Sequence, residues 1–267
     1  MSEVLVVTSG KGGVGKTTTT ANIGAALASL KKRVLLIDTD IGLRNLDLIL
    51  GLENRVVFNL VDVLEDTCGL KSALVRDKRL DTLYLLPAAQ TNDKDAVNET
   101  QMKHLCDEVR QEYDYVILDC PAGIEQGFKN AVAGADRAIV VTTPEVSAVR
   151  DADKIIGMLN AYGVHEHQLL VNRIRPEMVR RGDMLHLEDI TDILNIDLLG
   201  VVPDDELVIV SANRGEPIVL HGKSLASLAY RNIARRITGE TVPLLELSVR
   251  DSFFSRVRQL FAREGVS

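Results

Sequence analysis

Apolar residues occur in several short runs along the chain, and stretches with helical spacing separate many of them. Short runs of β-forming residues that end at a polar side chain are typical of strands buried on both faces of a parallel sheet. We expect strands at residues 4–7, 33–38, 82–86, 115–119, 138–142, 168–171 and 198–202. The expected helices include residues 18–30, 147–160, 187–194 and 224–237, where apolar residues recur every three or four positions.

The alternation of strands and helices predicts the fold class. Parallel strands joined by helical crossovers form a doubly wound, mostly parallel α/β sheet, whose ligand binds at the carboxyl ends of the strands. We find no repeat and no long internal linker, so residues 1–240 are expected to form one domain. Residues 241–250 are expected to be a linker to a distinct C-terminal segment, residues 251–267.

Composition narrows the class of protein. The chain has 267 residues, 46% of them hydrophobic, and a formal net charge of −7. That charge argues against a protein that coats nucleic acid through bulk positive charge, and it is typical of a soluble cytosolic protein. No basic segment precedes an apolar one at the N-terminus and no run of 18 apolar residues occurs, so we expect neither a secretion signal nor a spanning helix.

The cysteines and histidines do not predict a metal centre. Cys68, Cys106 and Cys120 form no C-x-x-C pair, so we expect reduced thiols rather than a disulfide framework, a zinc site or an iron–sulfur cluster. His165 and His167 are two residues apart in what we expect to be a polar loop, a spacing that does not place both on one helix face.

The clearest chemical motif is the stretch from Gly10 to Thr17, which matches the phosphate-binding pattern G-x-x-x-x-G-K-[ST]. It lies between an expected buried strand and an expected helix, which is the context that such a loop requires. Lys16 is expected to reach the β- and γ-phosphates of a nucleotide, and the Thr17 hydroxyl to bind Mg²⁺. The alternative is a glycine-rich turn followed by a chance Lys-Thr pair.

A second lysine, Lys11, lies near the start of the same loop. The string Lys-Gly-Gly-Val-Gly-Lys-Thr resembles the deviant Walker A motif of the ParA/MinD family of ATPases. The resemblance implies a dimer with nucleotide sandwiched between two copies, in which Lys11 reaches the phosphates bound by the partner, much as an arginine finger does. Without the resemblance, Lys11 would be an exposed lysine that adds positive potential.

Acidic residues follow two of the expected strands. Asp38 and Asp40 come at the end of one strand, and Asp119 ends another in the manner of a Walker B strand, where it would bind Mg²⁺ through water. The family resemblance implies that Asp40 positions or activates the attacking water, that Asp38 orders the water shell of the metal, and that Gly123 senses the γ-phosphate. The alternative for Asp38 and Asp40 is a pair of solvated loop acids.

Two further strand ends are expected on the base side of the nucleotide. Asn172 and Arg173 end one strand, and Pro203, Asp204 and Asp205 end the next. In relatives with the same Asn-Arg pair the asparagine amide contacts adenine, so the resemblance implies this role here, although an asparagine at a strand end is as often a turn residue. The complete set of expected nucleotide-binding residues is Gly10, Lys11, Gly12, Gly13, Val14, Gly15, Lys16, Thr17, Thr18, Asn172, Pro203 and Asp205.

The C-terminal segment has an amphipathic pattern. One apolar stripe faces a side that carries arginines, which is typical of a helix lying in a membrane interface. A helix docked on the core or in a partner's groove would show the same pattern. The stripe consists of Phe253, Phe254, Val257, Leu260 and Phe261, and the opposite side carries Arg250, Arg256, Arg258 and Arg263.

Several other stretches resemble the MinD members of the family, namely residues 40–47, 59–64, 85–91, 181–185 and 211–217. The resemblance implies an Mg²⁺-dependent ATPase that forms homodimers with ATP on the inner face of the cytoplasmic membrane and helps to place the division site. It further implies recruitment of a MinC-type division inhibitor and release by a MinE-type activator, through a surface that includes Ser147, Arg150, Asp151 and Asp153. The tail is less basic than is usual for these members, so dependence on anionic lipid is expected to be milder.

Two other functions remain open from the sequence. A ParA-like DNA-segregation ATPase would share the loop but would bind DNA in a salt-sensitive way, and the aromatic tail argues against it. A metabolic P-loop enzyme would need a second-substrate pocket or cluster cysteines.

Overall fold

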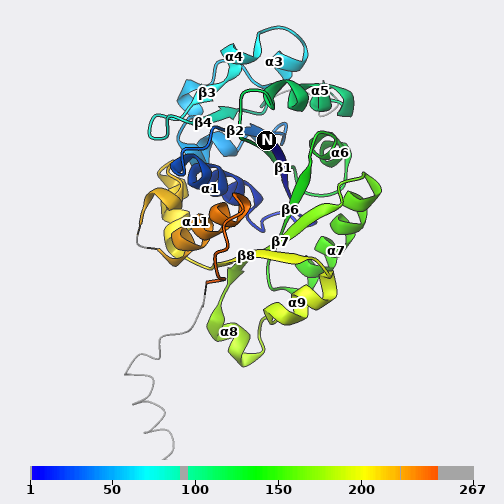
Figure 1. The fold of residues 1–267 in the computed structure, drawn as a ribbon, viewed down its shortest axis with the longest axis vertical. Coiled ribbons are helices and arrows are strands. Elements are labelled where there is room, and N and C mark those ends of the chain that lie inside the picture. The colour runs from blue at the N-terminus through cyan, green and yellow to red at the C-terminus, as the bar shows by residue number, and fades with distance from the viewer. Residues whose placement is uncertain (1, 91–95, 223, 246–267) are drawn as a thin grey trace, which may run out of the picture.

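The computed structural model describes residues 2–90, 96–222 and 224–245, and within them one eight-stranded sheet runs through the molecule (Figure 1). The strand order is β3-β4-β2-β5-β1-β6-β7-β8, and every neighbouring pair is parallel except β3 and β4. The strands are β1 (Glu3–Thr8), β2 (Val34–Asp38), β3 (Val75–Arg76), β4 (Leu83–Leu86), β5 (Tyr115–Asp119), β6 (Arg137–Thr142), β7 (Glu166–Ile174) and β8 (Asp197–Pro203). The predicted doubly wound, mostly parallel sheet is therefore confirmed.

Helices cover both faces of the sheet. One face carries α1, α2 and α11 with the short helix η3, and the other carries α3, α5, α6, α7 and α9 (Figure 1). The helices are α1 (Lys16–Ser29), α2 (Leu46–Leu50), α3 (Leu60–Leu64), α4 (Leu70–Ala73), α5 (Glu99–Val109), α6 (Gln126–Val132), α7 (Val146–Ala161), α8 (Pro176–Arg181), α9 (Leu187–Leu194), α10 (Glu206–Asn213) and α11 (Leu225–Ile237), with the short helices η1 (Glu53–Arg55) and η3 (Ile218–Leu220).

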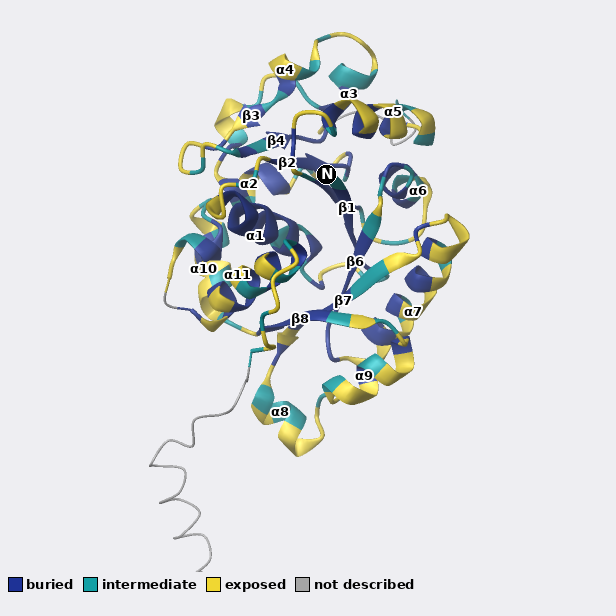
Figure 2. Ribbon diagram, in the orientation of Figure 1, coloured by how far each residue is buried: buried dark blue, intermediate teal, exposed yellow. Residues whose placement is uncertain are grey.

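Strand β1 shows how the two cores arise from one sequence pattern. Val4 and Val6 belong to the core under α5, α6 and α7, whereas Leu5 and Val7 belong to the core under α1 and α11. Because successive strand residues point to opposite faces, a strand covered on both sides must be apolar throughout. Figure 2 shows the result, with a buried sheet and exposed outer faces on the helices.

The expected elements agree with the structure to within two residues at their ends, except that β7 continues three residues further than predicted, to Ile174. Strand β7 begins at Glu166, so Glu166 and His167 belong to a strand and the predicted polar loop there was wrong. Hydrogen-bonded pairing with β6, in which Ala138 lies opposite His167, extends this strand beyond its apolar run.

A short antiparallel strand that the sequence did not predict ends one side of the sheet. Strand β3 pairs only Val75 and Arg76 with β4. The guanidinium of Arg76 returns to Asp81, with 2.8 Å between Nη2 and Oδ1, and the Arg76 carbonyl accepts a hydrogen bond from Arg55. The outer edge of β3 is thus occupied by charged side chains.

The predicted C-terminal helix at residues 251–267 lies outside the described residues, as do residues 246–250 of the predicted linker at 241–250. The described chain ends beside α11, where Arg236 donates to the carbonyls of Val242 (2.8 Å) and Pro243 (2.6 Å) and Leu245 packs against the core. The proposed division into residues 1–240, 241–250 and 251–267 stays a prediction.

Candidate functional site

The phosphate loop, residues Gly10–Thr17, connects the carboxyl end of β1 to α1. Gly13 and Gly15 adopt positive φ angles of 79° and 98°, which a residue with a Cβ rarely adopts. Gly15 is also the N-cap of α1, so the helix begins at Lys16, two residues earlier than predicted. The loop therefore meets the N-terminus of a 14-residue helix, a place that favours bound phosphate.

Two carboxylates meet beside this loop. Asp38 ends β2, Asp119 ends β5, and the strand register places them directly opposite each other. Each is only 1% exposed. Hydroxyl groups of α1 contact Asp119: Thr20 donates to its Oδ1 over 2.9 Å, and Thr17 also forms a hydrogen bond with it. The predicted metal-binding residues Thr17, Asp38 and Asp119 are thus brought together.

Burial controls the titration of this acidic pair. Removal from water raises the pKa of Asp38 to about 8, and the charge of Asp119 adds to the shift. Removal from water also raises the pKa of Asp119 to about 6, although hydrogen bonds from Thr17 and Thr20 and the charge of Lys16 act in the opposite direction. A cation bound between the loop and these acids would reduce the repulsion between the two buried carboxylates and stabilise their charged forms. The oxygen atoms of Thr17, Asp38 and Asp119 are ligands that suit Mg²⁺.

The acidic pair predicts how stability depends on pH. Unfolded aspartates lose their protons near pH 4, whereas Asp38 and Asp119 in the folded protein keep theirs up to about pH 8 and 6. Between about pH 4 and pH 8 the folded state therefore binds more protons than the unfolded state. The free energy of unfolding should consequently fall as the pH rises through this range. We expect the melting temperature in EDTA to drop between about pH 6 and 8, and to drop less with Mg²⁺ and ADP. An identical slope under both conditions would contradict the expectation.

Asp38 also organises the segment that follows β2. Its two carboxylate oxygens accept hydrogen bonds from the backbone amides of Asp40 (3.0 Å) and Leu46 (3.2 Å). Thr39 donates through its amide (3.1 Å) and its hydroxyl (2.7 Å) to the carbonyl of Asp119. These hydrogen bonds fix the backbone of the half-buried Asp40 next to Asp38. Asp40 also lines a cavity of about 180 Å³ between the segments that follow β2 and β5.

Lys11 lies at the exposed rim of the site and contacts α7 of its own chain. Its Nζ lies 3.3 Å from Glu145 Oε2 and 3.2 Å from Ser147 Oγ, and its side chain is 42% exposed. The start of the loop also fits closely against α7, since a Cβ on Gly10 would lie 2.2 Å from the Asp151 carbonyl oxygen. The predicted partner surface, residues Ser147, Arg150, Asp151 and Asp153, therefore lies on the helix that borders the phosphate loop.

A second cavity of about 560 Å³ lies on the other side of the loop. Its lining includes Gly15 and Thr18 of the phosphate loop segment together with three residues expected near the base, Asn172, Pro203 and Asp205. Asp205 is also the N-cap of α10, where it accepts from the Leu207 amide (2.9 Å), and its other oxygen accepts from Ser224. The structure thus places all these residues at one pocket.

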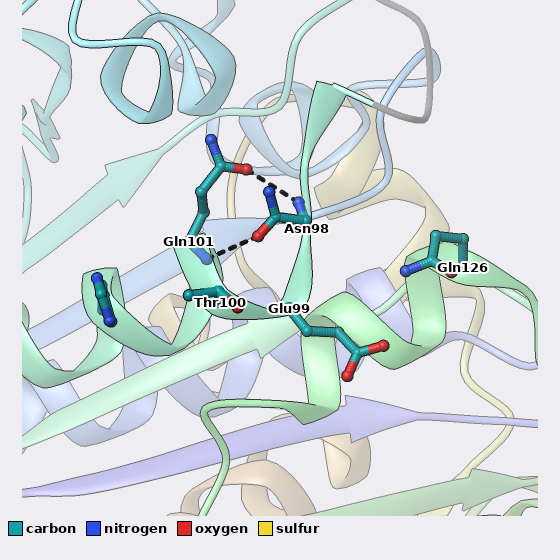
Figure 3. A pocket seen from close by; sticks show the side chains of 6 residues that line it. Asn98, Glu99, Thr100, Gln101 and Gln126 are labelled. Atoms are coloured by element: carbon teal, nitrogen blue, oxygen red, sulfur yellow. Dashed lines mark hydrogen bonds between the residues drawn. The ribbon is translucent and has the colours of Figure 1, made fainter.

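Another pocket, of about 580 Å³, lies at the start of α5 (Figure 3). Asn98 and Gln101 face each other there and exchange two hydrogen bonds of 3.0 Å, which together cap the helix. Their polar groups serve the helix end, and the pocket lies apart from the phosphate loop, so we assign it no chemistry.

The cysteines and histidines do not enter the site chemistry. All three cysteines are free thiols, and burial raises the pKa of Cys106 and of Cys120 to about 12. Within the described part of the chain, no group of three or more His, Cys, Asp or Glu side chains has metal-binding geometry. Nor does any described helix combine the length and apolar character needed to cross a bilayer.

Three residues of the site were missed from the sequence. Thr20 and Thr39 both bind Asp119, and Glu145 binds Lys11. The run of threonines from Thr17 to Thr20 was a usable signal for Thr20, since residues one turn apart on a helix share a face. Glu145 gave no local signal because 134 residues separate it from Lys11.

Comparison with known proteins gives the relationship of the whole chain. A family model described as an AAA domain matches residues 2–170. The septum site-determining protein MinD of Bacillus subtilis is 58% identical over 264 residues, which cover 98% of both chains. The chain belongs to the MinD family. The sequence-based resemblance is thereby confirmed, and the ParA-like alternative loses its support.

Solved structures of the MinD family agree with this fold. The MinC:MinD cell division protein complex of Aquifex aeolicus contains a chain that is 51% identical, with a TM-score of 0.87 over 92% of this chain and 100% of that one. The MinD of Pyrococcus horikoshii complexed with Mg-ADP is 29% identical, with a TM-score of 0.81 over 89% of this chain and 96% of that one. MinD proteins thus include one that binds Mg-ADP and one that assembles with MinC.

Proposed function

We propose that this chain is an ATPase that dimerises with ATP, associates with the cytoplasmic membrane and determines the position of the division site. The observation that carries the proposal is the joint placement of Lys11, Lys16 and the Asp38–Asp119 pair around one phosphate loop. Membership in the MinD family supports the cell-division role. The Mg-ADP complex of a relative supports the nucleotide and the metal.

The residues of the loop divide the chemical work. Backbone amides from Gly10 to Thr17 and the Lys16 ammonium would hold the phosphates, while the Thr17 hydroxyl and Asp119 would hold Mg²⁺. The metal, when bound, neutralises charge that develops on the phosphoryl oxygens. Asp38 fixes the backbone at Asp40, and the Asp40 carboxylate orients the attacking water and accepts its proton. Gly123, in the segment after β5, is proposed to sense the γ-phosphate through its backbone.

Lys11 is proposed to act on the phosphates bound by a partner copy. To do so it must leave Glu145 and Ser147, and the Lys11–Glu145 pair has side chains that are 42% and 56% exposed. Exposed ion pairs contribute only about 0–1 kcal/mol, so this contact presents a small obstacle compared with a triphosphate as the new partner. Dimerisation would then complete a site that each copy holds only in part.

The partner surface is proposed to lie on α7. Ser147, Arg150 and Asp153 are exposed there, and Asp151 is half-buried and paired with Lys154 over 3.1 Å. The complex of a 51% identical relative with MinC supports a MinC-type inhibitor as one partner. A MinE-type activator is proposed to use an overlapping surface, because changes at α7 reach Lys11 and Gly10 directly.

Membrane association is proposed to depend on residues 251–267. Five apolar side chains, each contributing roughly 1.5 kcal/mol, and arginines contributing about 1 kcal/mol each near anionic lipid, must offset the free energy of ordering the helix. One copy therefore binds weakly. Two copies held in a dimer make the second insertion intramolecular, which raises avidity by roughly 10² to 10⁴.

The proposal is tested by sedimentation with liposomes. We expect the protein to sediment with vesicles that contain anionic lipid in ATP and to stay in the supernatant in ADP, because only the ATP state dimerises. Added salt should weaken binding only modestly, since the tail carries Asp251 and Glu264 beside its arginines. Equal sedimentation in ATP and ADP would contradict ATP-dependent membrane association. A salt-sensitive DNA mobility shift in the presence of ATP would instead support the ParA-like alternative.

A further inference from the structure

Strand β7 contains a bulge at the residues that face the nucleotide pocket. From Val171 to Ile174, β7 advances three residues while β8 advances two, from Val201 to Pro203. The extra residue lies at Asn172–Arg173, and Arg173 has a left-handed φ of 55°. Bulges turn side chains out of the alternation of a strand and are frequent next to active sites. The strained backbone at Arg173 thus sets the direction of Asn172.

The bulge directs Asn172 toward the phosphate loop. The side chain is 5% exposed, and its Nδ2 donates a hydrogen bond of 2.8 Å to the carbonyl of Val14. Its Oδ1 accepts from the Arg173 amide over 2.9 Å, which fixes which end of the amide faces the loop. Asn172 therefore binds the phosphate loop at the Val14 carbonyl, one residue before Gly15, whose φ angle is positive.

Gly15 fits against the same side chain. A Cβ at Gly15 would lie 2.4 Å from Asn172 Nδ2, so the two residues are in close contact. Gly15 combines that contact with a φ of 98° and with the start of α1. The peptide between Val14 and Gly15 is consequently held from the β7 side, and its orientation decides where the neighbouring amides point.

We propose that Asn172 is a positioning residue of the phosphate loop, which acts through Val14 and Gly15, and not only a reader of the base. The inference rests on the proposed binding of ATP at this loop. Asn172 also lines the cavity expected to hold the base. One side chain then joins the two halves of the nucleotide site, so that a base bound beside Asn172 favours the loop geometry that binds phosphate.

This role predicts the pattern of affinities across ligands. A residue that only reads adenine affects ATP and leaves ligands without that base unchanged. A residue that shapes the loop affects every ligand with a polyphosphate by the same factor. Asn213 offers a matched control, because it is an exposed asparagine that lines the same cavity from the end of α10.

The experiment compares Asn172→Ala and Asn213→Ala in the full chain. Affinities for ATP, GTP and inorganic tripolyphosphate, each with Mg²⁺, are measured by competition against a fluorescent ATP analogue. We expect Asn172→Ala to weaken all three by a similar factor, roughly tenfold, since a buried carbonyl loses its donor. Asn213→Ala should leave tripolyphosphate unchanged. Glycine amide signals of the nucleotide-free loop, in a ¹⁵N-labelled sample, should shift only in Asn172→Ala.

Several outcomes would overturn the inference. Weaker ATP binding with unchanged tripolyphosphate binding would make Asn172 a base reader alone, and unshifted glycine signals would contradict a role in loop geometry. Melting temperatures without ligand check that each variant is folded, and Asn172→Ser, too short to reach Val14, replaces the alanine variant if that one unfolds. Failure of the unaltered protein to bind ATP would instead defeat the proposed function.

Discussion

The Asp40→Ala variant is expected to bind ATP and dimerise normally but to hydrolyse ATP at least about 100-fold more slowly, which is the loss typical of a missing general base. Asp40 contacts Asp38 through its backbone amide, so the truncated side chain leaves that hydrogen bond intact. The variant also leaves Lys16, proposed to bind phosphate, and Thr17, proposed to bind Mg²⁺, unaltered. Single-turnover hydrolysis, with light scattering to monitor the dimer, measures the two properties separately.

Glu65→Ala provides the control for Asp40→Ala. Glu65 is an exposed acid at the end of α3, and its removal changes the net charge by the same amount without altering the site. It should hydrolyse ATP at the native rate. Unchanged turnover in Asp40→Ala would remove Asp40 from catalysis, whereas loss of ATP binding would show that its role is in the ground state.

Deletion of residues 253–267 is expected to reduce ATP-dependent sedimentation with liposomes to the background level and to leave the ATP-dependent dimer intact. The deletion removes every member of the apolar stripe, and each copy in the dimer then has nothing to insert. Sedimentation gives the membrane readout, and size-exclusion chromatography with light scattering gives the oligomer.

A matched control separates the stripe from the tail as a whole. Gln259→Ala changes the polar side of the predicted helix and should sediment like the unaltered chain, whereas Phe254→Ser changes the stripe and should sediment poorly. Loss of the dimer together with sedimentation would indicate that the segment docks on the core. Loss of neither would remove the tail from membrane binding.

The sequence was sufficient for the fold because the sheet is buried on both faces. A strand such as β5, with no polar residue before Asp119, can be read locally, and the left-handed glycines of the phosphate loop are part of a motif with fixed spacing. Acids that end parallel strands lie at the same edge of a sheet, so the sequence placed Asp38 and Asp119 on one edge, whereas their closeness depends on the pairing of β2 with β5, which the sequence did not predict.

Contacts between distant segments could not be read in the same way. The bond from Asn172 to Val14 spans 158 residues and depends on a bulge, and a bulge has no signature in the pattern of β7. Lys11 was assigned to a partner copy by resemblance, while its contacts with Glu145 and Ser147 arise from the packing of α7 beside the loop. Strand β3 was missed because two residues are too few to show a period.

The short strand β3 affects how readily the sheet edge can pair with a strand of another molecule. At the high local concentrations that the proposed membrane association would create, an open sheet edge would template pairing between neighbouring molecules. Here the β3 edge extends for only two residues, runs against the direction of the sheet and carries Arg76 tied to Asp81 and Arg55. Such an edge resists the addition of a foreign strand, so β3 is expected to reduce aggregation through this side of the sheet.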